Sequence, residues 1–427
     1  SDSLNELGFF AEEVWQLIAQ QYPDLNFSEY DLFAVFHAGV GRDINTPGSL
    51  GIERDLPSVY LGINTLQNIF GENFQGFPVN GSAPITNTMI LPETESRELE
   101  GIGGTVLLEL TINGLIVASI ASHLGLPDLF NTETGLSAIG RLGLMDGQAI
   151  FAYSGVFPPE PSPWEKIQLG WIEPVVIDDP ANVSLAVNEN FGDTVLVKVP
   201  INSSEYYLIE NRNRDTDNDG AVVTYKLDNE TFTETFTEDT TGFYSFDTDT
   251  LKGVITDVDE FDWALPGSGI VIWHIDENII ADNLSTNSIN NDLFNRGVDV
   301  EEADGIQDIG EEFSTIFGET VIGEGTEEDF WFASNPAQLY QNKFTPSTKP
   351  NTNSNSGANS LINIVDFSDV SNKMSFELFF ADEQVRLRTF RNLSVDGSIK
   401  YVSSVNDGTE NYLLFTTDEN TLYLTDV

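Results

Sequence analysis

The chain has 427 residues, of which 69 are acidic and 18 are basic, and it contains no cysteine. This composition excludes disulfides, thiolate metal ligands and thiol catalysis, and a surface so acidic repels nucleic acid and anionic lipid headgroups. Because no apolar run is long enough to span a bilayer, we expect no membrane span. The length of the chain predicts two or three domains.

The first predicted element is an amphipathic helix over residues 3–20, which Ser3 and Glu6 begin with the spacing of a capping box. The apolar positions that follow the helical period are Leu4, Leu7, Phe10, Val14 and Leu17. The next segment, "YDLFAVFHAGVG", predicts a buried strand that ends in a glycine turn. Residues 41–100 are rich in Gly, Pro and Asn and predict long loops with short elements, and residues 105–124 predict a helix that Pro127 closes.

Short β-branched or aromatic runs follow, separated by turn residues, and they predict an antiparallel, sandwich-like domain. These runs are "TVLVKV", "EYYLIE", "AVVTYKL", "GIVIWHIDE" and "MSFELFF". From about residue 385 the pattern of strand and turn predicts the start of another β-domain, propeller-like in texture. We therefore expect an α+β chain with domains at 1–175, 176–382 and 383–427.

Catalytic motifs are missing. A zinc peptidase helix needs two His residues one turn apart and a Glu beside the first, but His37, His123 and His274 are isolated and no His-Glu pair occurs. No G-x-S-x-G sequence supports a serine nucleophile. We interpret the three histidines as structural or surface residues.

The stretch "DTDNDG", residues 215–220, is the first candidate metal site. Asp215, Asp217 and Asp219 alternate, and Gly220 permits the sharp turn that wraps oxygen ligands around Ca²⁺. The twelfth loop position is a lysine, so the loop is not an EF-hand, and Asp228 or Glu230 would have to supply a further carboxylate. The alternative is a solvated acidic turn.

A second oxygen-rich candidate for calcium is "GVDVEEADG", with Asp299, Glu301, Glu302 and Asp304. Calcium at either place would screen repulsion between carboxylates. The chain also offers Asn-x-Ser/Thr sites, or Ser and Thr themselves, for glycans. The sequons begin at Asn26, Asn80, Asn182, Asn202, Asn229, Asn283 and Asn392.

Taken in order, six phrases resemble the immune inhibitor A family of secreted bacterial zinc metallopeptidases. They are "FSEYDLFAVFHAG", "HLGLPDLFN", "GLMDG" with "SPWEKIQLGWIEP", "YYLIENRNRD", "LPGSGIVIWHIDEN" and "GVDVEEADG". The likeness covers residues 27–305 and extends through "INIVDFSDVSNKMSFEL" to about residue 380. It implies a zincin-like domain followed by a β-rich domain packed against it.

In that family H-E-x-G-H precedes the phrase that here reads "HLGLPDLFN". The resemblance therefore assigns Ala118 and Ser122 to the zinc-ligand positions and Ser119 to the general-base position, so the catalytic residues are absent and no zinc is expected. His123 is one residue late, which rotates it by about 100° around the helix. The resemblance thus implies a pseudopeptidase.

Two classes of function follow. The first is a catalytically inactive extracellular or cell-surface scaffold that acts as a structural or binding protein, for example as a repeating subunit of a filament. The alternative is a secreted hydrolase with a displaced metal site, or a peptide-binding module that uses the old cleft. Because the apolar face of the first helix and the last strands lack partners in the sequence pattern, we expect self-association or flanking sequence to complete both ends.

Overall fold

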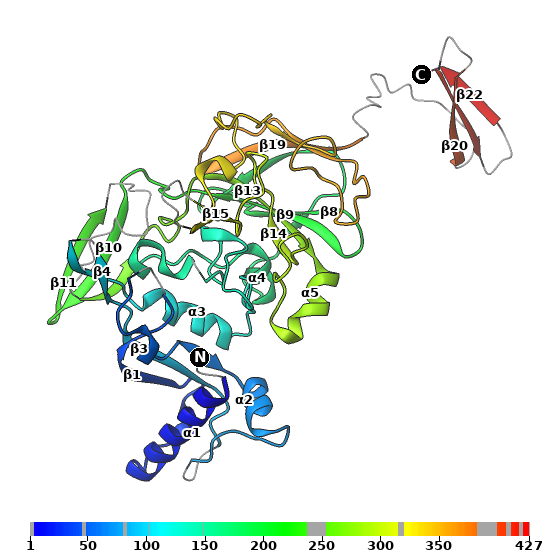
Figure 1. Cartoon of the computed structure of the whole chain (residues 1–427). Helices are drawn as coiled ribbons and strands as arrows, with labels where there is room; N and C mark the ends of the chain where they lie inside the picture. Colours follow the sequence, from blue (N-terminus) through cyan, green and yellow to red (C-terminus); the bar gives the residue numbers. More distant parts are fainter. Residues whose placement is uncertain are drawn as a thin grey trace. The chain divides into compact units, whose positions relative to one another are not determined.

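The computed structural model describes residues 4–44, 48–79, 83–101, 103–147, 149–236, 253–314, 320–381, 399–406, 411–417 and 422–426. The chain forms two compact units, Ser1–Phe379 and Phe380–Val427. Sheets predominate over helices, so the fold is mixed α+β as predicted (Figure 1). Among the described helices, none is long and apolar enough to cross a membrane. Ser3, Asn80 and Asn392 lie outside the described residues.

The predicted first helix is confirmed as α1, but its buried face differs from the expected one. The helix α1 (Leu4–Gln21) buries Leu7, Ala11, Trp15 and Ala19, whereas Leu17 is 47% exposed. Its buried face packs in a core with Phe27 and Leu66, which belong to the same chain. Residues of the same chain therefore cover this face, while completion of the two ends by self-association or flanking sequence stays a prediction.

The first sheet has the order β1-β3-β2. Its strands are β1 (Ala34–Val40), β3 (Thr88–Thr94) and β2 (Val59–Leu61), and helix α2 (Ile63–Phe70) follows β2. Strand β1 was predicted to be buried, but it lies parallel to β3 at the sheet edge, and Phe36 is 57% exposed. The buried strand is instead β3, because it has a neighbour on both sides.

The helix predicted over 105–124 is half wrong. Residues Gly104–Leu108 form strand β5, which pairs with β4 (Arg97–Gly101) in a hairpin, and helix α3 begins only at Asn113 and ends at His123. Glycines at the ends of the two strands, Gly101 and Gly104, and the β-branched Thr105 and Val106 of β5 favour the hairpin. Gly114 then allows α3 to approach its neighbour, because a Cβ there would lie 1.8 Å from Ile150 O.

The predicted β-runs are confirmed as strands, arranged in several sheets. The five-stranded sheet has the order β14-β13-β9-β8-β6, and the four-stranded sheet has the order β17-β18-β19-β7. In the five-stranded sheet the pairing is antiparallel apart from β6 with β8, which is parallel, and in the four-stranded sheet β17 with β18 and β19 with β7 are antiparallel. The strands of these two sheets are β6 (Val175–Val176), β7 (Ala181–Ala186), β8 (Leu196–Pro200), β9 (Glu205–Arg212), β13 (Gly269–Asp276), β14 (Val298–Val300), β17 (Lys343–Phe344), β18 (Ile362–Val365) and β19 (Lys373–Phe380).

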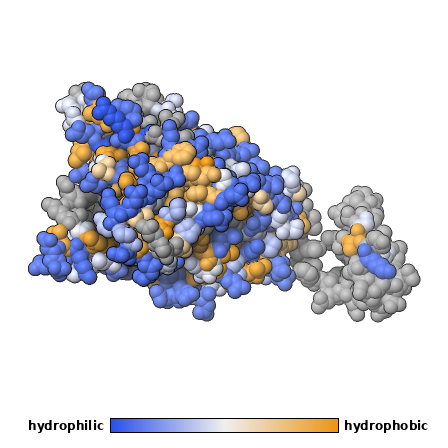
Figure 2. Space-filling view, turned by 90° about the horizontal axis from the view of Figure 1, so that it is seen from below, coloured by the Kyte–Doolittle hydropathy of each residue, from blue (hydrophilic) through white to orange (hydrophobic). Residues whose placement is uncertain are grey.

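The two larger sheets contact each other through aromatic side chains. Tyr207 of β9 packs edge-on against Phe344 of β17, with ring centroids 5.2 Å apart, and Trp331 lies 5.1 Å from the same Phe344 ring. All three are fully buried, so they form the centre of the core between the sheets. On the outside, hydrophilic residues cover most of the face shown in Figure 2, with hydrophobic residues scattered among them.

Smaller elements connect these parts. They are helices α4 (Pro163–Gln168) and α5 (Glu277–Asn283), the 3₁₀ turns η1 (Phe27–Glu29), η2 (Ile52–Arg54), η3 (Gly140–Leu142), η4 (Ala149–Gly155), η6 (Leu284–Thr286) and η7 (Glu327–Asp329), the sheet β11-β10-β12 (Glu230–Phe236, Ala221–Leu227, Val254–Val258) and the hairpin β15-β16 (Glu312–Ser314, Thr320–Ile322).

The second unit contains three antiparallel strands in the order β20-β21-β22. They are β20 (Ile399–Asn406), β21 (Asn411–Thr417) and β22 (Leu422–Asp426). The predicted succession of strand and turn is therefore present, while the propeller-like character of this unit stays a prediction.

Candidate functional site

Helix α3 carries the positions at which the resemblance would place the zinc ligands and the general base. Ala118 has no ligand atom, and the Ser122 hydroxyl donates a hydrogen bond to Ala118 O at 3.1 Å. Ser119 is buried. In the part of the chain that the structure describes, no group of three His, Cys, Asp or Glu side chains gathers at this helix.

His123 ends this helix and is engaged with an aromatic side chain. Its Nδ1 lies 3.1 Å from the Tyr60 hydroxyl oxygen, and the two rings meet edge-on with centroids 5.7 Å apart. Burial raises the pKa of Tyr60, which keeps that hydroxyl protonated. The other histidines lie elsewhere, His37 on β1 and His274 on β13, so the structure assembles no histidine pair.

The loop "DTDNDG" brings its three carboxylates together. Ligand oxygens of Asp215, Asp217 and Asp219 lie within 4.8 Å of one another. The Asp219 amide donates to Asp215 Oδ1 at 3.2 Å, and the Gly220 amide donates to Asp215 Oδ2 at 3.1 Å, with Gly220 at φ +88°. A hydrogen bond with Asp217, together with slight desolvation and neighbouring charges, raises the pKa of Asp219. This loop is largely exposed.

The additional ligands expected for this loop are not there. Asp228 and Glu230 lie at the far end of the β10–β11 hairpin, seven or more residues along an extended strand from Gly220. Asp259 is closer, because its Oδ1 accepts a hydrogen bond from the Val222 amide at 2.6 Å and its charge acts on Asp219.

Of the second predicted carboxylate set, Glu302 and Asp304 lie together, whereas Asp299 and Glu301 have other partners. Asp299 accepts a hydrogen bond from Arg296 Nη1 at 2.9 Å, and Glu301 lies 3.1 Å from His274 Nδ1, so Asp299, Glu301 and Asp304 do not converge. The reason is that β14 pairs with β13, which places Asp299 opposite His274. Glu302, the residue after Glu301, has its carboxylate within 4.8 Å of the Asp304 carboxylate.

A buried carboxylate cluster forms instead from Glu302, Asp304 and Asp329, whose oxygens lie within 4.8 Å of one another. Glu302 and Asp329 are 1% and 4% exposed. Backbone amides hold each carboxylate in place: Asp308 N donates to Glu302 Oε2 at 2.8 Å, Thr326 N to Asp329 Oδ2 at 2.6 Å, and Ile306 N to Asp304 Oδ1 at 2.8 Å. Across the described residues, no Lys, Arg or His forms an ion pair with any of these three carboxylates.

The electrostatics of the buried carboxylate cluster follow from this missing counter-charge. Burial raises the pKa of Glu302 to about 10, and burial together with Asp304 and Asp308 raises the pKa of Asp329 to about 7 despite the Thr326 hydrogen bonds. At neutral pH, Glu302 therefore holds a proton unless a cation replaces it. Such a site favours a bound cation over an unneutralised charge.

The donor set decides which metal the cluster suits. Carboxylate and other oxygen ligands suit hard cations such as Ca²⁺ and Mg²⁺, whereas structural zinc takes mainly His and Cys ligands. Calcium tolerates the irregular arrangement of a turn and a distant side chain better than Mg²⁺, which requires near-octahedral geometry. The residues present therefore fit Ca²⁺. Sequence reasoning did not find Asp329, because it lies 25 residues beyond Asp304 and no spacing connects the two.

Comparison with known proteins adds no relative: no family model, no curated protein and no solved structure matches this chain.

Proposed function

We propose that the chain is a secreted, catalytically inactive, zincin-like protein that acts as a structural or binding scaffold outside the cell or at its surface. The observation that supports this proposal lies on helix α3, where the resemblance assigns Ala118 and Ser122 to the ligand positions and where the Ser122 hydroxyl donates to the backbone of its own helix. Neither side chain holds Zn²⁺, and Ser119 does not replace a carboxylate base.

The test of inactivity is metal content together with proteolysis. Purified chain dialysed against zinc should retain well below one equivalent at α3 and should not cleave casein above the level of a buffer control, because no base activates water there. The variant Ala118→His with Ser119→Glu and Ser122→His restores the ligand types and serves as the matched comparison for zinc binding. Stoichiometric zinc in the native chain with chelator-sensitive cleavage would instead support the hydrolase with a displaced metal site.

We further propose that calcium stabilises this scaffold at the cluster of Glu302, Asp304 and Asp329. These carboxylates would supply the protein ligands. The ion would neutralise carboxylates that burial otherwise keeps protonated at least in part. Calcium at about a hundred times its dissociation constant should then add about 2.7 kcal/mol to the free energy of unfolding. Melting curves in calcium and in chelator measure this difference.

The variant Glu302→Gln separates calcium binding from packing. Because the pKa of Glu302 is about 10, the carboxyl is neutral without metal, and an amide of the same shape should leave stability in chelator unchanged within about 0.5 kcal/mol. In calcium, the variant should lose most of the free energy of unfolding that calcium adds to the native chain. Asp217→Asn is the control for the exposed loop, and equal losses in both variants would refute the assignment to the buried cluster.

Self-association is the use we propose for such a scaffold. Strand β1 lies at the edge of the first sheet, and within the described residues β3 is its only paired strand neighbour. An edge strand presents N–H and C=O groups that can pair with a strand of another chain. Exposed Phe36 on that strand would add apolar contact area, which supports assembly through this edge.

A further inference from the structure

The first unit contains a cavity of about 500 Å³ whose lining includes no residue of helix α3 and none of the three cluster carboxylates, although Thr326, which holds Asp329, lines it. Its charged lining consists of Arg141, Arg214 and Glu327. A volume of this size accommodates a small organic molecule. In a chain with 18 basic against 69 acidic residues, two arginines in one cavity are a concentration of positive charge that the rest of the sequence does not favour.

Arg214 is held rigidly against the cavity wall. Its Nε and Nη2 donate to Trp263 O at 2.9 and 2.7 Å, and its guanidinium carbon lies 5.3 Å from the centroid of the Trp263 ring. Its backbone amide also donates to the Ser268 hydroxyl at 3.1 Å. These contacts fix the plane of the guanidinium before any ligand arrives, and preorganisation of this kind favours binding.

Arg141 is only weakly neutralised by the protein. Its Nε is buried, makes no hydrogen bond to a described residue and lies 3.9 Å from Glu324 Oε2, beyond hydrogen-bond distance. Burial raises the pKa of Glu324 to about 7 although Arg141 opposes the shift, so this carboxyl carries only part of a negative charge at neutral pH. The Arg141 side chain is 14% exposed and lines the cavity, and a partly buried guanidinium that the protein neutralises only weakly favours an anionic ligand.

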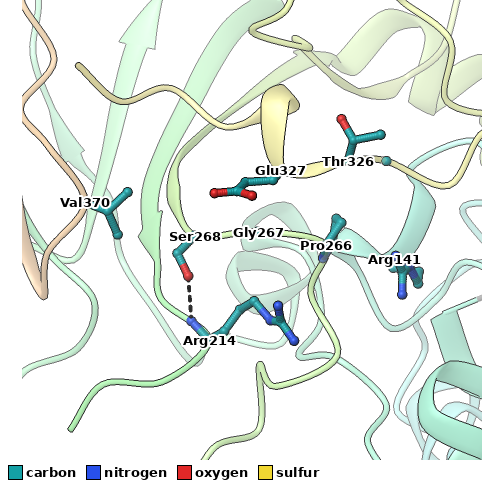
Figure 3. Close-up of a pocket in the computed structure, with 9 residues that line it drawn as sticks. Arg141, Arg214, Pro266, Gly267, Ser268, Thr326, Glu327 and Val370 are labelled. Atoms are coloured by element: carbon teal, nitrogen blue, oxygen red, sulfur yellow. Dashed lines mark hydrogen bonds between the residues drawn. The ribbon is translucent and has the colours of Figure 1, made fainter. Parts of the chain in front are cut away.

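The negatively charged residue of the lining, Glu327, lies at another part of the cavity. Figure 3 shows the Glu327 carboxylate turned toward Ser268 and Val370, whereas the guanidinium groups of Arg141 and Arg214 lie on the side of Pro266. The absence of a side chain at Gly267 lets the backbone at Glu327 approach this wall closely, because a Cβ on Gly267 would lie 2.7 Å from Glu327 Cα. The cavity therefore separates an anion-binding end from a cation-binding end.

We propose that this cavity binds a zwitterion, with the carboxylate of the ligand at Arg141 and Arg214 and its ammonium group at Glu327. A guanidinium donates charge-assisted hydrogen bonds to a carboxylate, and Glu327 matches an ammonium group in charge. Free amino acids and the ends of short peptides share this chemistry. The site goes beyond the proposed scaffold role, and it shares no residue with the carboxylate cluster.

The test is calorimetric titration of the full chain, in buffer saturated with calcium, with alanine and with dialanine up to about 10 mM. Acetate and N-acetylalanine, which lack the ammonium group, and alanine methyl ester, which lacks the carboxylate, are the half-ligands. We expect alanine or dialanine to bind at least about tenfold more tightly than any half-ligand. Tighter binding of alanine would identify the ligand as a free amino acid, and tighter binding of dialanine would identify it as a peptide.

Two variants assign the ends of the ligand. Arg141→Met should weaken the binding of both the zwitterion and acetate at least about tenfold. Glu327→Gln should weaken the binding of the zwitterion alone. Glu327 is exposed, so its variant should fold, and the controls Arg54→Met and Glu328→Gln remove equal charges from exposed positions outside the cavity. The proposal is overturned if no zwitterion binds, if half-ligands bind equally well, or if the controls weaken binding as much as the cavity variants.

Discussion

Replacing Arg212 by Met should lower the free energy of unfolding of the first unit by about 3 to 5 kcal/mol, the usual effect of stranding a buried partner charge. The Arg212 side chain is 3% exposed and pairs with Asp262, to which Nε donates at 2.5 Å, and with Glu210 at 3.0 Å. Its Nη1 also donates to Leu142 O at 3.2 Å, so the residue connects β9 to the turn η3. Methionine would fill much of the space but leave Asp262 without its cation and Glu210 with only Lys166, whose Nζ lies 3.9 Å from Glu210 Oε2.

Urea unfolding monitored by tryptophan fluorescence measures this loss, since all six tryptophans lie in the first unit. Arg54→Met removes the same charge from an exposed position and should change stability by less than about 0.5 kcal/mol. Adding Asp262→Asn to Arg212→Met should recover part of the loss, because one stranded charge disappears. A loss below about 1 kcal/mol in the single variant would show that the ion pair does not hold these elements together.

Stability of the first unit should fall as the pH rises from 6.5 through about 9, because His274 then loses its proton. Burial alone would lower the pKa of His274, but the Glu205 carboxylate 3.4 Å from Nε2 and the hydrogen bond with Glu301 outweigh burial and raise the pKa to about 9. A group whose pKa is higher in the folded state contributes stability that is fully present below its unfolded pKa and is lost above its folded pKa. The shift corresponds to about 3 kcal/mol.

The measurement is the urea midpoint at pH 6.5 and above pH 9. His274→Gln should be less stable at pH 6.5 and should lose less stability than the native chain across this window, because its amide does not titrate while buried carboxyls such as Glu302 still do. His37→Gln, on the edge strand β1, should keep the pH dependence of the native chain. If the native chain and His274→Gln show the same slope, another group causes the pH dependence.

The fold was predictable where a segment carried its own pattern. The runs that became β9 and β13 are continuous in β-branched and aromatic residues, and both strands are buried along their whole length. The central strand β3 was missed because "TMILPET" is short and contains Pro92. Likewise, β5 was taken for helix because "TVLLEL" contains good helix formers, and only its pairing with β4 decides the outcome.

The candidate site was predictable only where its residues are neighbours in the sequence. Asp215, Asp217 and Asp219 converge because one turn holds all three. The buried cluster requires Asp329 to approach Glu302, and this depends on the Ala303 amide, which donates to Asp329 O at 3.1 Å. The Glu301 side chain faces His274 because β14 pairs with β13. The spacing of residues along the sequence predicts neither the approach of Asp329 to Glu302 nor this orientation of Glu301.

The contacts between residues 128–132 and 287–291 have a consequence for folding during synthesis. The Asp128 amide donates to Asn287 Oδ1 at 2.9 Å, the Asn290 side chain donates to Leu129 O at 2.9 Å, and the Thr132 amide donates to Asn291 Oδ1 at 2.9 Å. About 160 residues separate the partners in each bond. At about 5 to 20 residues per second, the ribosome needs roughly 10 to 30 s to add the second segment after the first. Until then the segment after α3 lacks its partners, so its final packing is a late event, and the nascent chain needs protection from aggregation over that interval.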